Sequence, residues 1–453
     1  MFHKLVPLWG RVLGRKTRQA ANRLLTIFFF VNALASVILH LHPQRGFTSL
    51  LIWVPKVLAA TFAPVLTFIN LMAIALGFLR REWRWSLSGM VGAGLSMHYF
   101  YQIQRPSPGF DEVFGPKWRM RVPTHLRPSL FPHGRWTRLL RAPRRVQREM
   151  DVVIGKSPTT GKDLLANIWL PPEEVSSNRA AIIYVHGGAW IYGDKDDTQR
   201  PTFRHLAGQG YLVMDVAYTL WPDSDLPHMV QEVKQAILWL KRHSKRYGID
   251  PERITLSGAS AGGHLALLAA YTPSHPAFQP PDDDGDASVR SAIVFYPPVD
   301  FRAMYNDMES VFGDFMRDRR VTFLANRAAD ALKKMGYIPE TYQVRGDLNI
   351  IRHMLGGSPD EIPQVYELLS PIHHVDPQDP PTLIFQGEDD FFRLAPSLRE
   401  LHRKLKATGV PAIYLEFPYT PHGFDLFLPQ ISPVALRSFQ EMDRFLFLIN
   451  FSQ

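Results

Sequence analysis

The sequence predicts an α/β fold, in which helices cover a mostly parallel sheet, for residues 150–453, and a helical membrane region for residues 1–103. Two observations predict this division. After Glu149, short β-branched and aromatic runs alternate with longer helical patterns, which is typical of a parallel sheet with crossover helices. Before that point, long uncharged segments alternate with clusters of arginine and lysine.

Composition excludes several classes of protein. The 453 residues contain no cysteine, so disulfides, thiolate metal sites and a cysteine nucleophile are excluded. Residues 1–149 hold 22 lysines and arginines against four acidic residues, whereas residues 150–453 hold 29 against 38. A basic segment suggests anionic lipid or nucleic acid as a partner. We expect no nucleic-acid binding, which would require this charge on a folded module with base-stacking aromatics.

Three apolar runs, at residues 24–41, 57–79 and 85–103, predict two or three transmembrane helices. The first two have about the 20 residues needed to span hydrocarbon. The third contains serine, glycine and histidine, and small residues are common where membrane helices pack closely. A cleaved signal peptide is the alternative for the first run, but no small-residue cleavage pattern clearly follows it and a second run comes soon after.

Charge around these runs predicts the orientation in the membrane. The basic first 23 residues and the arginines between the second and third runs place the N-terminus on the cytoplasmic side. Three crossings would put the following domain outside. The basic residues in 104–149, expected to form a linker, would favour the cytoplasmic side if the third run did not cross, but long translocated domains largely escape the charge rule, so we expect the external side.

The C-terminal domain, residues 150–453, is expected to contain eight strands, of which the first two form an antiparallel hairpin at the sheet edge. The strands are predicted at residues 151–154, 164–170, 181–185, 212–217, 254–256, 292–296, 382–385 and 413–417. Helical periodicity is clear at residues 227–245, 262–270, 395–407 and 434–448. A mostly helical insertion at about residues 301–370 would lie over the carboxyl ends of the strands as a lid, where α/β sheets bind ligands.

A serine nucleophile is predicted at Ser260. The stretch Gly258-Ala-Ser-Ala-Gly262 lies between a predicted strand and an alanine-rich helical segment. Glycines two residues before and after the serine permit a strained turn that lifts the hydroxyl above the sheet. The pattern alone is weak, but its position between strand and helix makes it specific.

A serine hydroxyl needs a base, and the base needs a carboxylate that orients it. His422 follows the last predicted strand and is the candidate base. Asp390 lies three residues after Gly387, which ends the preceding strand, and its neighbour Asp389 is the competing candidate. The chain order of serine, aspartate and histidine is the one that this kind of site uses.

The stretch "HGGAW", residues 186–190, predicts an oxyanion hole. Backbone N–H groups of Gly187 and Gly188, joined by that of Ala261 after the nucleophile, are the expected donors, because absent side chains let a substrate come close. His186 is expected to hold this loop rather than to transfer protons.

Other conspicuous residues are assigned more ordinary roles. Trp190 and Tyr192 would either line the substrate pocket or pack under the loop. His264 is expected to be a packing or capping residue, and His373 with His374 lacks a third ligand at metal spacing, so neither a metal nor a cofactor is predicted.

The motifs "HGGAW", "GASAGG", "GEDD" and "PHGF", in this order, resemble those of the α/β-hydrolase superfamily. They look most like the carboxylesterase and lipase branch with an HGG loop, related to hormone-sensitive-lipase-like esterases, isoprenylcysteine methylesterase and kynurenine formamidase. The resemblance covers about residues 150–450. The glycine loop at residues 186–189 has the sequence HGGA instead of HGGG. The turn at residues 258–260 has the sequence GAS instead of the GDS usual in the hormone-sensitive-lipase branch.

Together these residues predict a membrane-anchored serine hydrolase that cleaves small-molecule or lipid-like esters through an acyl-enzyme. An amidase, peptidase or formamidase with the same residues is one alternative. A catalytically silent binding domain of the same fold is the other. The oligomeric state is left open.

Overall fold

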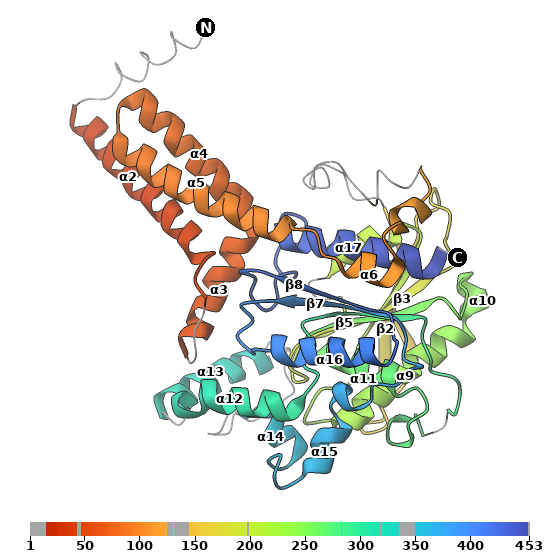
Figure 1. Ribbon diagram of the computed structural model, residues 1–453. Helices are drawn as coiled ribbons and strands as arrows, with labels where there is room; N and C mark the ends of the chain where they lie inside the picture. Colours follow the sequence, from red (N-terminus) through yellow and green to blue (C-terminus); the bar gives the residue numbers. More distant parts are fainter. Residues whose placement is uncertain are drawn as a thin grey trace.

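The computed structural model describes residues 15–42, 47–124, 130, 145–196, 199–281, 283–316, 319–334 and 349–451. Much of the arginine-rich stretch expected to be a linker lies outside these residues. The described part contains an eight-stranded sheet with helices on both faces and an N-terminal group of helices that projects from it (Figure 1).

The central sheet has the strand order β1-β2-β4-β3-β5-β6-β7-β8. Strands β1 and β2 pair antiparallel at the edge, as expected, and β2 also pairs antiparallel with β4, while all other neighbours are parallel. All eight predicted strands are confirmed. They are β1 Gln147–Lys156, β2 Asp163–Leu170, β3 Ala181–Val185, β4 Leu212–Val216, β5 Ile254–Ala259, β6 Ser291–Phe295, β7 Thr382–Gly387 and β8 Ala412–Phe417.

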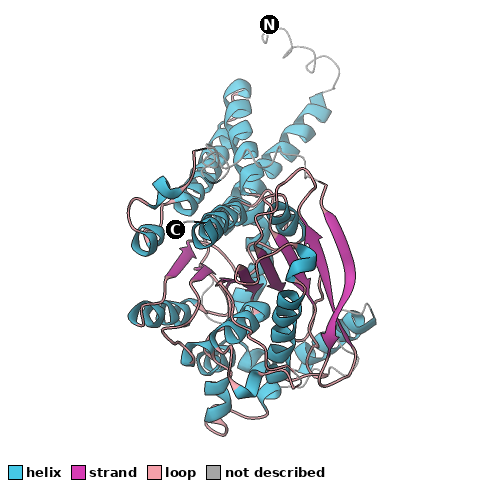
Figure 2. Ribbon diagram, turned by 90° about the vertical axis from the view of Figure 1, so that its right-hand side faces the viewer, coloured by secondary structure: helices cyan, strands magenta, loops and turns pink. Residues whose placement is uncertain are grey.

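Two apolar layers of helices enclose the sheet. Its central parallel strands are therefore buried on both faces, which explains why their sequences are almost entirely apolar. One layer contains α9 (Leu226–Arg242), α11 (Ala261–Tyr271) and α16 (Ala395–Ala407). The other contains α8 (Arg200–Ala207) and α17 (Pro433–Phe451). Figure 2 shows the helices on either side of the strands. Short helix α10 (Ser244–Tyr247) follows α9.

The described residues of the insertion after β6 are mostly helical, as predicted. They form α12 (Phe301–Met316), α13 (Arg319–Lys334), α14 (Ile350–Leu355) and α15 (Pro363–Leu368). Helix α12 also contacts the N-terminal helix α3, so the insertion and the N-terminal region meet.

In the N-terminal region, the described residues form four longer helices, which are α2 (Arg15–Ile38), α3 (Phe47–Thr61), α4 (Ala63–Arg80) and α5 (Trp83–Gln104). Helices α2, α4 and α5 pack together, while α3 lies against the sheet domain (Figure 1). The prediction of one helix at residues 57–79 was wrong. Helix α3 ends at Thr61, and after Phe62 a separate helix, α4, begins with a proline in its first turn, which favours a new helix start.

By length and composition, two helical segments could cross a membrane, Gln19–Ile38 and Ala63–Arg80. The first lies near the N-terminus, where a signal sequence has the same character. Helix α5, which corresponds to the third predicted run, is not one of these two segments.

Residues that follow α5 pack on the sheet domain. Helix α6 (Gly109–Phe114) lies against β8, and a 3₁₀ turn at Trp118–Arg121 follows it. Phe110 and Trp118 are both buried there. This first part of the expected linker is therefore folded onto the domain.

Candidate active site

Ser260 occupies a sharp turn between β5 and α11. Its backbone is in a rarely populated conformation, with φ 53° and ψ −122°. The turn is held by the Ser260 N–H, which donates to Phe295 O at 2.9 Å, and by close packing of the following glycine. A Cβ on Gly262 would lie 2.1 Å from Val185 O, so only glycine allows this approach of the turn to β3.

The structure brings together the three side chains predicted to act on one another. His422 Nε2 lies 3.1 Å from Ser260 Oγ, and His422 Nδ1 lies 2.8 Å from Asp390 Oδ2. Asp390 is buried, and its other oxygen accepts the Phe392 N–H at 2.9 Å. Both contacts to His422 have hydrogen-bond length, with each ring nitrogen facing a different partner.

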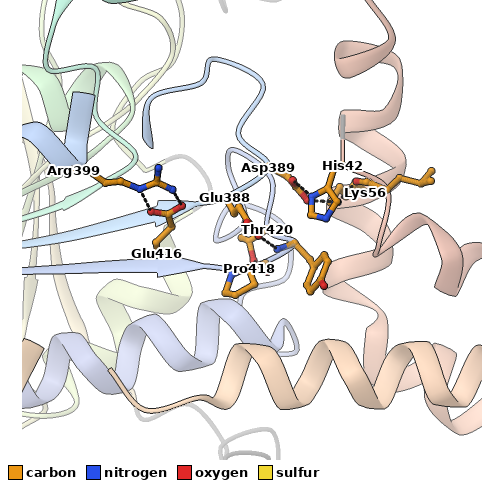
Figure 3. A network of polar contacts seen from close by, with 10 residues as sticks. His42, Lys56, Glu388, Asp389, Arg399, Glu416, Pro418 and Thr420 are labelled. Atoms are coloured by element: carbon orange, nitrogen blue, oxygen red, sulfur yellow. Dashed lines mark hydrogen bonds and ion pairs between the residues drawn. The ribbon is translucent and has the colours of Figure 1, made fainter. Parts of the chain in front are cut away.

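Asp389, the competing carboxylate, has a different partner. Its side chain accepts hydrogen bonds from Lys56 Nζ at 2.5 Å and pairs with His42 Nδ1 at 2.8 Å, both in the N-terminal region (Figure 3). Spacing along the sequence therefore identified the carboxylate that faces the imidazole.

The glycine pair lies beside Ser260. A Cβ on Gly187 would fall 3.4 Å from Ser260 Cβ, and Gly188 adopts φ 121°, where a side chain would collide with Tyr192 O. Within the described part of the chain, no acceptor pairs with the backbone N–H of Gly187 or Gly188. Ala261 is the first residue of α11, where helix N–H groups lack intrahelical partners.

His186 and Tyr218 support the loop that contains Gly187 and Gly188. The imidazole stacks on the Tyr218 ring at 4.4 Å, and the Tyr218 hydroxyl donates to His186 O at 3.2 Å. His186 Nδ1 lies 2.7 Å from Gly187 O.

Trp190 and Tyr192 have different surroundings. Trp190 is 1 % exposed and does not line the cavity described below, so its assignment to the substrate pocket is corrected. It packs under the loop, where its indole N–H donates to His264 Nδ1 at 3.3 Å and its rings meet Phe301 edge-on. Tyr192 lies on the surface and does line the cavity.

His264 is fully buried in α11. Its Nε2 lies 2.8 Å from Leu369 O. Burial lowers the pKa of His264 to about 4, so the ring is neutral near pH 7. Its ring packs between α11, the helix that contains it, and the insertion after β6.

A cavity of about 400 Å³ surrounds Ser260 and His422. One part of its wall is apolar and comes from four separate segments of the chain. These residues are Trp53 of α3, Met308 of α12, Phe391 and Phe392 after β7, and Leu426 after β8.

Other residues that line the cavity are polar and buried, among them Asp215, Tyr296 and Gln199. Asp215, at the end of β4, accepts the Asp196 N–H, and burial raises the pKa of Asp215 well above its ordinary value. Tyr296 donates its hydroxyl to Asp425, whose pKa is also raised by burial. Gln199 donates to the same carboxylate at 2.9 Å. In both cases the cause is burial, which penalises the charged form of a carboxyl group.

No group of three histidine, aspartate or glutamate side chains that could hold a metal ion occurs among the residues that the structure describes.

Sequence reasoning missed most of the cavity wall. The pair Phe391-Phe392 follows the acid directly and carried a usable signal. Asp215 and Tyr296 lie where parallel strands end, the edge at which such sheets bind ligands. Trp53 gave no signal, because it lies in an apolar helix far from every motif.

The fold and the site define an α/β-hydrolase in which one histidine contacts both a serine and an aspartate. A family model described as BD-FAE matches residues 166–405, and the chain belongs to that family. The matched segment contains Ser260 and Asp390 but ends before His422.

Several curated relatives are similar. The probable carboxylic ester hydrolase LipM of Mycobacterium tuberculosis is 30% identical over 291 residues, 64% of this chain and 59% of the relative. Esterase LipQ of the same organism is 28% identical over 268 residues, 59% of this chain and 55% of the relative. Arylacetamide deacetylase of Bos taurus is 32% identical over 116 residues, 25% of this chain and 29% of the relative. The chain thus spans less than two thirds of the length of these relatives.

A solved structure, the apo form of Thermogutta terrifontis esterase 2, has the same fold. It is 23% identical with a TM-score of 0.51, and the likeness covers 69% of this chain and 98% of that one.

Proposed function

We propose that this chain is a membrane-anchored serine hydrolase that cleaves carboxylic esters through an acyl-enzyme. The observation that carries the proposal is the pair of contacts from Ser260 Oγ to His422 Nε2 at 3.1 Å and from His422 Nδ1 to Asp390 at 2.8 Å, inside a cavity. The names of the curated relatives support the ester bond as the target.

In the proposed reaction, Ser260 Oγ attacks the ester carbonyl while His422 takes its proton. The imidazolium then returns that proton to the leaving alcohol, and a water molecule, deprotonated by the same ring, releases the acid. Asp390 holds the ring in the tautomer that leaves Nε2 free to accept. Its own two oxygens are fixed by hydrogen bonds from Phe392 and Gln386.

The oxyanion of the tetrahedral intermediate would be bound by N–H groups of Gly187, Gly188 and Ala261. Such donors act strongly because they are already oriented before the charge develops. The absence of a protein acceptor for the two glycine N–H groups, within the described residues, supports this role.

The cavity supports an ester with an apolar portion. Its lining residues Trp53, Phe391 and Phe392 offer apolar contact to that portion. The deacetylase among the relatives keeps an amide substrate as the second candidate. A silent binding domain is the third, but it has no need of the two contacts made by His422.

The packing of α2, α4 and α5 supports membrane anchoring, because polar groups face inward and apolar groups face outward. Asn70 and Ser36 are both 0 % exposed and hydrogen-bond to each other at 3.0 Å. Phe68 is 63 % and Phe78 71 % exposed on the outside of the bundle. Helices packed in lipid show this arrangement, with small and polar residues between them.

The arrangement of the helices supports a domain on the non-cytoplasmic side. Asn22 Nδ2 lies 3.5 Å from Glu82 Oε1, so the start of α2 and the turn between α4 and α5 share one end of the bundle. That end carries Arg80, Arg81 and Arg84, and it is the end away from the sheet domain (Figure 1). Positive charge favours the cytoplasmic side, which would place the domain opposite.

Turnover and covalent labelling of the purified full chain test this function. We expect hydrolysis of p-nitrophenyl acetate and labelling by a fluorophosphonate, and Ser260→Ala should abolish labelling and lower turnover at least about 10³-fold. Activity on an aryl formamide or a peptide anilide, without activity on the ester, would show that the enzyme cleaves amides instead of esters. Absence of labelling in the wild type, or labelling unchanged in Ser260→Ala, would instead favour the silent domain.

A further inference from the structure

Helix α3 contacts both loops that carry the partners of Ser260. One loop follows β7 and contains Asp389 and Asp390. The other follows β8 and ends at His422. Figure 3 shows Lys56 and His42, from the N-terminal region, pointing toward Asp389 beside these loops.

Lys56 contacts the first loop through a buried ion pair. Its side chain is 1 % exposed, and Nζ donates to Asp389 and to Leu41 O. Burial lowers the pKa of Lys56, and the charge of Asp389 opposes this shift. Asp389 is the residue directly before the acid of the site, and its own N–H donates to Thr420 O at 2.9 Å, which links the two loops.

Trp53, one helical turn before Lys56, contacts the second loop. Its indole N–H donates to the backbone carbonyl oxygen of His422 at 2.8 Å. The same ring lines the cavity and lies 5.3 Å from the ring of Phe391. One side chain of α3 therefore fixes the backbone of the candidate base and forms part of the substrate wall.

We propose that α3 belongs to the active site, with Lys56 as a residue that positions Asp390 and His422 and Trp53 as a residue that positions His422 and determines substrate specificity. This inference rests on the proposed hydrolase function. A helix that served only as a tether would need neither a buried charge paired beside the acid nor a hydrogen bond to the base.

Lys56 and Trp53 hold the two loops whose residues Asp390 and His422 form one short contact. The bond between His422 and Asp390 depends on how the two loops approach each other, and displacements near 1 Å cost about 10²-fold in rate. Lys56 holds the loop that carries Asp390 and Trp53 holds the loop that carries His422, both from the same helix. Their loss should therefore lower kcat more than it raises KM.

Variants of the full chain in lipid or detergent test the role of Lys56. Lys56→Met leaves the buried Asp389 carboxylate without its lysine partner and with only His42 beside it, so it should lower the melting temperature as well as kcat. The double variant Lys56→Met with Asp389→Asn removes both charges and should regain stability. We expect its kcat and its rate of fluorophosphonate labelling to stay at least about ten-fold below wild type. Recovery of kcat together with stability would overturn the positioning role.

Two further variants test Trp53. Trp53→Phe keeps a ring in the cavity wall but removes the N–H, so it should lower kcat with little change in KM. Trp53→Ala should in addition change the ranking of p-nitrophenyl esters of different acyl length. An unchanged kcat in Trp53→Phe and an unchanged ranking in Trp53→Ala would overturn this part of the inference.

Matched controls lie away from the site. Lys406→Met breaks an exposed ion pair with Glu112, and Trp83→Phe alters an exposed indole on α5. Both should behave as wild type. A wild type that is not labelled would overturn the hydrolase function itself, whereas normal labelling of wild type and Lys56→Met alike would overturn only the inference about α3.

Discussion

His264 illustrates how a histidine beside an active site can be structural. Both of its nitrogens are used inside the protein, one toward Leu369 O and one accepting from Trp190. Its folded pKa of about 4 lies below the ordinary 6.5. The stability that it provides is therefore complete above pH 6.5 and is lost as pH falls toward 4.

Acidification should destabilise the wild type through this ring. We expect a loss of at most about 3 kcal/mol between pH 7 and pH 4, which follows from the shift in pKa. His264→Gln keeps an acceptor and a donor but does not titrate, so its melting temperature should fall less over that range. If the melting temperatures of both proteins fall equally over the same pH range, His264 contributes nothing to acid sensitivity.

The residues that the sequence predicted and those that it missed differ in a physical way. Ser260, Asp390 and His422 each follow one of the parallel strands of the sheet, so local pattern and chain order together predicted that they meet. Trp53 and His422 are 369 residues apart. Their contact depends on how an apolar helix docks on a folded domain, and no local pattern encodes such docking.

At the scale of elements, the sheet was predictable because most of its strands are short, mainly apolar runs between turn residues. Helix α8, with eight residues, was missed because it is too short for a clear periodicity. The break at Phe62 was missed because an uncharged run looks alike whether it is one helix or two. Pro64, in the first turn of α4, was the available signal.

The nucleophile turn depends on the contact of Gly262 with β3. In Gly262→Ala the new methyl would lie 2.1 Å from Val185 O and 2.3 Å from His186 O, both backbone atoms that cannot move freely. We expect a loss of about 2–4 kcal/mol in stability and of nearly all fluorophosphonate labelling.

Gly263→Ala is the comparison for that variant, because its methyl would lie 3.1 Å from its nearest neighbours. It should keep most of its labelling. Equal melting temperatures and labelling for the two alanine variants would show that the close approach at Gly262 is not what shapes the turn.

At the scale of the whole molecule, the absence of cysteine makes the proposed topology directly measurable. Glu82→Cys and Ser176→Cys each introduce a single thiol, one in the turn between α4 and α5 and one on the exposed surface of the sheet domain. In intact cells, an impermeant maleimide should label Ser176→Cys and should label Glu82→Cys only after permeabilisation. The reverse pattern would place the sheet domain in the cytoplasm, and labelling of both would contradict three crossings.

The segment shared with the family ends before His422 and starts after α3. The part of the cavity wall that α3 supplies therefore lies outside that segment, and a different leading helix would close the cavity with different side chains. Selectivity within such a family could diverge by exchange of an appended segment, with the nucleophile left untouched. A tryptophan three residues before a lysine, as in Trp53-Val-Pro-Lys56, would then group relatives by substrate better than the shared segment does.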